Sequence, residues 1–188
     1  MAASDYALSD FVAELGAALS SALPEAARLE AGARALARLL ANPRALDAFR
    51  PALAHGRGPW TLYTDPAHGF VVTLLLKPHG GTTPVHHHGE AWTLYGIVEG
   101  VETIHRYERV DGAPPRHVAD HVRRAGEVEI EPAFAIHNET TSSGQDTLAL
   151  AVRGCDLAAT DHEWFDLATG QVTRGRGQPG RPLPPPLG

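Results

Sequence analysis

Three of the histidines stand at positions where they can act together. His86 and His88 belong to the segment VHHH at residues 85–88, which follows a glycine-rich turn and precedes an apolar run. In an extended chain side chains alternate faces, so these two imidazoles point to one side and His87 points to the other. Two imidazoles placed in this way can bind one metal ion, whose third ligand then comes from another strand. His137, in a later β-rich run, is the natural candidate. Histidines that lie in a core or at the surface without a metal are the alternative.

The other histidines give no comparable pattern. His87 is expected to pack or to meet solvent on the face away from the metal. His105, His117, His121 and His162 show no ligand spacing, and we expect them at the surface.

Short strands are predicted to carry the three candidate ligands. From Trp60 onward, β-rich runs alternate with turns that contain Gly, Pro and Asp. The predicted strands are 70–76, 92–98, 102–107, 118–122, 127–130 and 148–152. Many short strands with no helices between them indicate a sandwich, a jelly roll or a closed barrel.

The region before the strands is predicted to be helical. Apolar residues recur at helical spacing over residues 6–19, which predicts one amphipathic helix. Pro24 suits the first turn of a second helix that runs to about residue 41, and a short third helix is expected up to Phe49.

The end of the chain is different in composition. From about Thr173 it is rich in Gly, Pro and Arg, which predicts a loosely ordered tail. The expected organisation is therefore a helical segment at 1–55 packed on a barrel at 56–172, followed by a Pro/Gly-rich tail at 173–188.

Composition excludes several classes of protein. The chain has 188 residues, 43% of them hydrophobic, which suits one domain with a substantial core. Its net charge is -6, and no basic cluster is interleaved with aromatic residues, so a nucleic-acid partner is not expected. The N-terminus lacks the pattern of a secretory leader, and no run is long and apolar enough to span a membrane. The single cysteine, Cys155, fits a reducing compartment, so we expect a cytoplasmic protein without a membrane partner.

The spacing around the histidines resembles the two cupin motifs. The first motif is Gly, five residues, His-x-His, three or four residues, Glu, six residues and Gly. The chain has Gly80, His86, His88 and Gly100 at these distances but Thr93 in place of the glutamate. The resemblance implies a mostly β fold, the cupin double-stranded β-helix or jelly-roll barrel, here with an N-terminal helical segment.

The second cupin motif is matched in the same partial way. Gly126, Pro132 and His137 stand at the motif distances, whereas Phe134 replaces a glycine and Thr141 replaces an asparagine. The resemblance implies that His86, His88 and His137 are metal ligands.

A three-histidine site without the motif glutamate looks like that of the thiol dioxygenases, the group of cysteine dioxygenase and 3-mercaptopropionate dioxygenase. This resemblance implies Fe(II) as the cofactor. Manganese, nickel and zinc stay open, because imidazole suits several divalent metals.

Three neutral imidazoles leave the ion its full charge and up to three open positions, so that substrate and O2 can bind side by side. A thiolate would offset the missing carboxylate charge, and the metal lowers the pKa of a coordinating thiol. Holding both reactants together contributes roughly 7 to 11 kcal/mol in favourable cases. The expected product of a thiol is a sulfinate.

The chain departs from the thiol dioxygenases where that family binds its substrate. Residues 60–64 contain no Arg or Gln, and the Ser-x-His-x-Tyr run of the family corresponds here to Ala149, Ala151 and Arg153. The two alanines predict a larger pocket, and Arg153 is predicted to bind an acidic group of the substrate at its mouth. The phenol of Tyr63 is a candidate to replace the missing tyrosine.

The prediction is therefore a non-haem Fe(II) dioxygenase that adds O2 to a small organic thiol or a related anionic chelating substrate. The alternatives are a metal-dependent C–C cleaving dioxygenase of the β-diketone type, a cupin lyase or isomerase, and a cupin that binds a small ligand without turnover. Small-molecule substrate and O2 are the expected partners, and either a monomer or a homodimer is compatible with the sequence.

Overall fold

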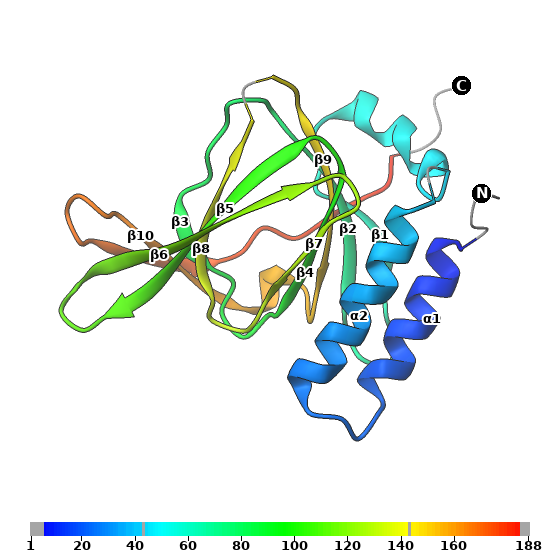
Figure 1. Cartoon of the computed structure of the whole chain (residues 1–188), viewed down its shortest axis with the longest axis horizontal. Helices are drawn as coiled ribbons and strands as arrows, with labels where there is room; N and C mark the ends of the chain where they lie inside the picture. Colours follow the sequence, from blue (N-terminus) through cyan, green and yellow to red (C-terminus); the bar gives the residue numbers. More distant parts are fainter. Residues whose placement is uncertain (1–5, 43, 143, 185–188) are drawn as a thin grey trace.

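The computed structural model describes residues 6–42, 44–142 and 144–184. Two six-stranded sheets form a flattened barrel, and a pair of helices lies against one side of it (Figure 1). No helix of the described residues is long and apolar enough to cross a membrane.

The first sheet has the order β12-β1-β2-β9-β4-β7. Its strands are β1 (Trp60–Thr64), β2 (Val71–Lys77), β4 (Thr93–Glu99), β7 (Val128–Glu131), β9 (Thr147–Arg153) and β12 (Arg181–Pro182). The second sheet has the order β11-β10-β3-β8-β5-β6. Its strands are β3 (Val85–His87), β5 (Val101–Val110), β6 (Ala113–Arg124), β8 (Ile136–Thr141), β10 (Asp161–Phe165) and β11 (Val172–Arg176).

The strand pairs are nested, which identifies the topology. β5 pairs with β6, β4 with β7, β3 with β8 and β2 with β9, all antiparallel. A long hairpin wound in this way distributes its pairs alternately over two sheets, which is the double-stranded β-helix of a jelly roll. The fold predicted from the sequence is confirmed.

The helices cover the outer face of the first sheet. α1 (Leu8–Leu19) and α2 (Glu25–Leu40) present apolar stripes, and Phe11, Leu15 and Leu36 are fully buried. They pack in one cluster with outward-facing residues of the sheet such as Leu94 and Leu150. The largest apolar core therefore lies between helices and sheet, outside the barrel.

The barrel interior is strongly polar. Lys77 on β2 forms ion pairs with Glu102 (3.2 Å) and Glu139 (3.4 Å) of the opposite sheet. Arg106 on β5 likewise reaches across to Glu129 on β7. Buried charges are tolerated only when they are paired, and these pairs join the two sheets across the space that the candidate ligands face.

Two predicted features differ from the structure. The expected third helix is a 3-10 segment, η1 (Asp47–His55), and it extends past Phe49. The expected loose tail is wrong for residues 173–176 and 181–182, because β11 pairs with β10 and β12 pairs in parallel with β1. Residues 185–188 of that tail lie outside the described residues.

Candidate metal centre

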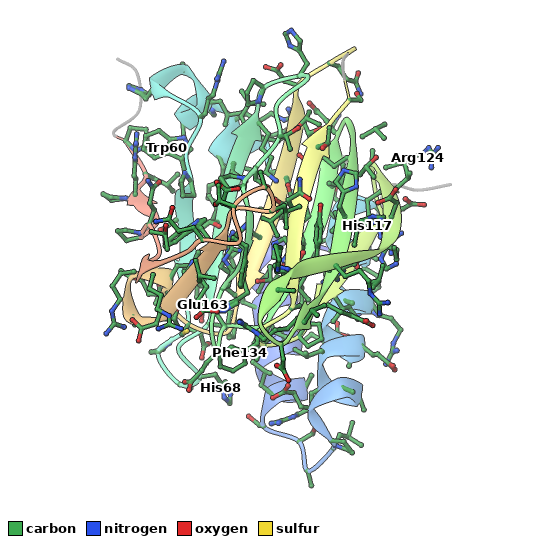
Figure 2. All side chains as sticks on the ribbon, turned by 90° about the vertical axis from the view of Figure 1, so that its left-hand side faces the viewer. Trp60, His68, His117, Arg124, Phe134 and Glu163 are labelled. Atoms are coloured by element: carbon green, nitrogen blue, oxygen red, sulfur yellow. The ribbon has the colours of Figure 1, made fainter. Side chains whose placement is uncertain are left out.

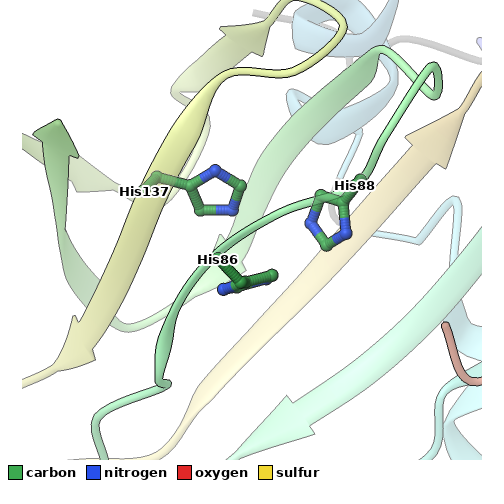
Figure 3. Close-up of side chains that lie close together, drawn as sticks. All are labelled: His86, His88 and His137. Atoms are coloured by element: carbon green, nitrogen blue, oxygen red, sulfur yellow. The ribbon is translucent and has the colours of Figure 1, made fainter. Parts of the chain in front are cut away.

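The three candidate ligands converge because β3 and β8 are neighbours. His86 and His137 face each other directly in the register of this pair, and His88 follows β3 on the same side of the chain. The rings turn toward a common point (Figure 3). Their centroids are 4.7 Å apart for His86–His88, 4.6 Å for His86–His137 and 5.1 Å for His88–His137.

These separations suit three ligands on one ion. With metal–nitrogen bonds of about 2.1 Å, imidazoles at octahedral or tetrahedral angles have centroids roughly 4.5–5.3 Å apart. One ring nitrogen of each histidine lies within 4.8 Å of the others. His86, His88 and His137 therefore fit a bound divalent metal.

Backbone carbonyls orient two of the rings. Nδ1 of His86 donates to the carbonyl of Pro84 (2.8 Å), and Nδ1 of His137 donates to that of Ala135 (3.1 Å). Both rings then keep Nε2 as the atom with a free lone pair. Such a hydrogen bond fixes tautomer and orientation in metal-binding histidines. Nε2 of His137 is buried, and no hydrogen bond from the described residues reaches it.

The environment also favours the metal-binding protonation state. Burial lowers the pKa of His86 and His137, and burial followed by the charge of Arg153 holds the pKa of His88 well below its ordinary value. All three imidazoles are therefore neutral near pH 7, which is the form that binds metals.

Two carboxylates border the triad. Oε2 of Glu131 lies 3.4 Å from Nε2 of His137, and Oε1 of Glu139 lies 3.8 Å from the same atom. Burial would raise the pKa of Glu139, but the charge of Lys77, the neighbouring histidines and the hydrogen bond from Thr83 together outweigh it and hold that pKa well below the ordinary value. Burial, followed by repulsion from Glu139, raises the pKa of Glu131.

A cavity of about 310 Å³ opens beside the triad. His86 and His88 line it from one side, and Val71, Thr73 and Leu75 of β2 line it from another. Gly177, Gln178 and Gly180 contribute a further wall, so the C-terminal segment helps to enclose the space.

Arg153 lines this cavity, as the sequence predicts. Its Nη1 donates to Oγ1 of Thr73 (3.0 Å), whereas its buried Nε has no hydrogen-bond partner among the described residues. Burial lowers the pKa of Arg153, which nevertheless stays charged at any physiological pH. A permanent cation with an unused donor therefore stands in the cavity wall.

Tyr63 does not lie in the cavity wall. Its hydroxyl donates to Asp65 (3.0 Å), and its ring packs against Phe70 with centroids 5.8 Å apart. A register shift in β1 between Thr61 and Tyr63 pairs Tyr63 with Val72, and both residues pack in the core on the side of the helices, so the suggested role of Tyr63 in the site is wrong. Ala149 and Ala151 face the barrel interior in a cluster with Tyr95, not the cavity, so they do not enlarge it.

Two residues near the triad escape prediction from the sequence. His162 on β10 is buried rather than exposed, lines the cavity, and stacks edge-on against His88 with centroids 5.1 Å apart. Burial lowers the pKa of His162 to about 4. Glu131 escapes because the run Val128–Glu131 alternates apolar and acidic residues, which normally indicates carboxylates facing water. Here they face the polar barrel interior, because helices cover the other side.

Phe134, one of the residues that depart from the motifs, has the backbone conformation that explains the glycine of the motif. Phe134 has a φ of 61°, the backbone conformation for which the motif uses glycine, and its side chain is 57% exposed near Glu163 (Figure 2).

His87 faces away from the triad, as predicted. It is buried, accepts a hydrogen bond from the backbone of Gly89 (2.9 Å) and donates to Glu163 (3.1 Å).

Comparisons with known proteins give limited information. No family model matches the chain, and no curated protein matches it. An oxalate oxidase bound to glycolate is 20% identical, with a TM-score of 0.41 over 46% of this chain and 42% of its own. An RmlC-like cupin protein from Ralstonia eutropha is 24% identical, with a TM-score of 0.42 over 62% of this chain and 64% of its own. The protein TT1209 from Thermus thermophilus is 18% identical, with a TM-score of 0.44 over 57% of this chain and 91% of its own.

This chain covers less than two thirds of the oxalate oxidase structure. The identities and TM-scores are all low, so these likenesses carry no argument about function. The fold assignment depends on the strand order instead. The jelly-roll fold and the histidine triad together fit a metal-dependent cupin.

Proposed function

We propose that the protein is a non-haem Fe(II) dioxygenase that oxidises a small anionic chelating substrate, an organic thiol or a related compound, with O2. The observation that supports this most is a single cavity that has two of the three clustered imidazoles on one wall and the Arg153 guanidinium on another. Bound there, the metal would supply adjacent open positions for substrate and O2.

The protein's own residues would select and orient the substrate. Arg153 presents a donor to an acidic group, and charge-assisted hydrogen bonds to arginine are strong and directional. Val71, Leu75 and Trp164 form apolar parts of the same wall. Such a lining favours a compact molecule with one anionic end.

Cys155 and His162 also line the cavity but are expected to stay neutral. Burial raises the pKa of the Cys155 thiol, so this group is not a ready nucleophile at neutral pH. The Nε2 atom of His162 is hydrogen-bonded to Oγ1 of Thr160 (3.0 Å). The reaction would therefore be centred on the three clustered histidines.

The test is metal analysis of protein purified without chelators, followed by O2-consumption assays over a panel of thiols and 1,3-dicarbonyl compounds. We expect about one divalent ion per chain and O2 uptake that depends on a thiol and on Fe(II). Turnover without O2 consumption would contradict the proposal and indicate a lyase or isomerase. Tight binding of a panel compound without turnover, after reconstitution with fresh Fe(II), would indicate a non-catalytic cupin.

A further inference from the structure

Glu131 is a buried carboxylate without a cation. It is 3% exposed, and its Oε1 atom has no hydrogen-bond partner among the described residues. Within the same part of the chain, no lysine or arginine lies within ion-pair distance of it. Among the described residues, the one ionisable side chain within ion-pair distance of Glu131 is His137. Burying a carboxylate without a partner is costly, so such a group either takes up a proton or binds a cation.

Its position relative to His137 is that of a neighbouring metal ligand. Oε2 of Glu131 lies 3.4 Å from Nε2 of His137, and that nitrogen also lacks a hydrogen bond from the described residues. With bonds of about 2.1 Å, adjacent ligand atoms on an octahedral or tetrahedral ion are roughly 3.0–3.4 Å apart. Two acceptor atoms this close repel each other unless a proton or a cation lies between them, and a metal held by the histidines would be that cation.

Glu139 shows that proximity to His137 is not sufficient. Its Oε1 is paired with Lys77 at 3.4 Å, and its Oε2 accepts from Thr83 at 2.5 Å. Both oxygens of Glu139 are therefore occupied by the protein. Glu131 has no such partners.

We propose that Glu131 is a direct ligand of the metal together with His86, His88 and His137. Glu131 offers an oxygen within 4.8 Å of His137 and Glu139 but does not belong to the group of ligand atoms formed by the three histidines, so binding requires its side chain to turn toward them. The inference depends on the metal centre proposed above and adds a carboxylate to it. Thr93, where the first motif lacks its glutamate, lies directly opposite Glu131 on the neighbouring strand β4, and Arg153 lies opposite Thr93 on its other side. A carboxylate on β7 and one on β4 would thus approach the ion from adjacent positions.

A fourth protein ligand changes the substrate that the site favours. It offsets one charge of the ion and leaves two adjacent positions of an octahedron instead of three. A thiolate is then not required for charge balance. A bidentate anion whose free acidic group pairs with Arg153 fits the remaining positions.

The experiment measures Co(II) binding to the full chain by calorimetry and by the visible absorption of the bound ion. The variant Glu131→Gln keeps the size of the side chain and removes its charge. The matched control is Glu129→Gln on the same strand, which is equally buried but pairs with Arg106 and Arg123. The double variant Thr93→Glu/Glu131→Gln places a carboxylate on the opposite strand.

We expect Glu131→Gln to bind Co(II) at least about 10- to 100-fold more weakly, by comparison with the loss of groups that only support a ligand, and to change the Co(II) spectrum. Glu129→Gln should keep both properties, and the double variant should recover affinity. Co(II) binding by Glu131→Gln with unchanged affinity and spectrum would overturn the inference and leave the three-histidine centre intact. No Co(II) binding by the unmodified protein would overturn the proposed function as well.

Discussion

Arg153 is the residue that decides which ligands the cavity can hold. Its guanidinium is anchored by Thr73 at 3.0 Å and keeps a buried Nε without a partner among the described residues. Replacement by Met keeps an unbranched apolar stem of similar reach to Nε but removes the charge and the donors. We expect Arg153→Met to raise KM for an anionic substrate about 10- to 100-fold, because a hydrogen bond to a charged group contributes about 1.5–3 kcal/mol.

Metal content should not change in this variant, since Arg153 is not a ligand. Arg116→Met is a suitable control, because Arg116 on β6 is exposed, pairs with Glu108 on β5 and does not line the cavity. Steady-state kinetics after Fe(II) reconstitution measure the effect. An unchanged KM in Arg153→Met would remove the guanidinium from substrate binding.

Glu163 makes the free energy of unfolding depend on pH in the acidic range. Its hydrogen bond to Arg109, followed by those to Arg174 and His87, lowers its pKa from 4.5 to about 2. The unfolded chain binds a proton near pH 4.5, whereas the folded chain does so only near pH 2. The stabilisation is therefore complete above pH 4.5 and is lost as pH falls toward 2.

We expect Glu163→Gln to lack this pH-dependent contribution. Denaturant unfolding of both proteins at several pH values measures it. The difference in unfolding free energy between the two proteins should shrink between pH 4.5 and pH 2. Parallel curves over this range would show that the ion pairs of Glu163 contribute nothing.

The contact between α2 and β4 holds the helical pair on the barrel. Gly96 allows it, because a Cβ atom there would lie 2.8 Å from Leu40 and 3.2 Å from Leu36. We expect Gly96→Val to destabilise the protein by about 1–3 kcal/mol through overpacking. Gly144→Ala is the control, since no atom lies within 4 Å of its added carbon.

Chemical denaturation measures this effect, and metal affinity should stay the same because Leu36 and Leu40 lie outside the barrel. Full stability of Gly96→Val would mean that the helices adjust easily and that the contact is loose.

The elements differ in how far their sequences predict them. The strands β2, β4 and β9 are predictable because their runs are mostly apolar, and α1 and α2 because their stripes have helical spacing. The alternation of β7 correctly predicts a strand, but it places Glu129 and Glu131 on a face toward water. They face the barrel interior instead, because this sheet is apolar on the side of the helices and polar on the side of the interior. β11 and β12 are not predictable, since their Gly- and Arg-rich residues gain order only by pairing with β10 and β1.

At the scale of the whole molecule, the site is assembled from distant parts of the chain. The ligand pair at 86 and 88 was predictable from alternation, and His137 from its place in a second motif. His162 was not, because a single histidine on a strand gives no signal until β10 is known to lie beside β3. The contribution of Gly177 and Gly180 to the cavity wall was likewise not predictable, because the Gly/Pro/Arg-rich composition of this segment indicates a loosely ordered tail.

The jelly-roll topology explains why so few residues suffice to make the site. It places β3 beside β8 in one sheet and β4 beside β7 in the other, so that side chains from four strands face one interior. The apolar core is mostly outside, against the helices, which frees the interior for charged groups. The barrel thus acts as a rigid support for a polar centre.

Anomalous X-ray diffraction from crystals grown with Fe(II), collected at the iron edge, tests the central claim most directly. The predicted result is one peak at about 2.0–2.3 Å from ring nitrogens of His86, His88 and His137. A crystal with no peak there would contradict the account. So would a peak only at the group of possible ligands formed by His105, His117 and Asp120 on β5 and β6.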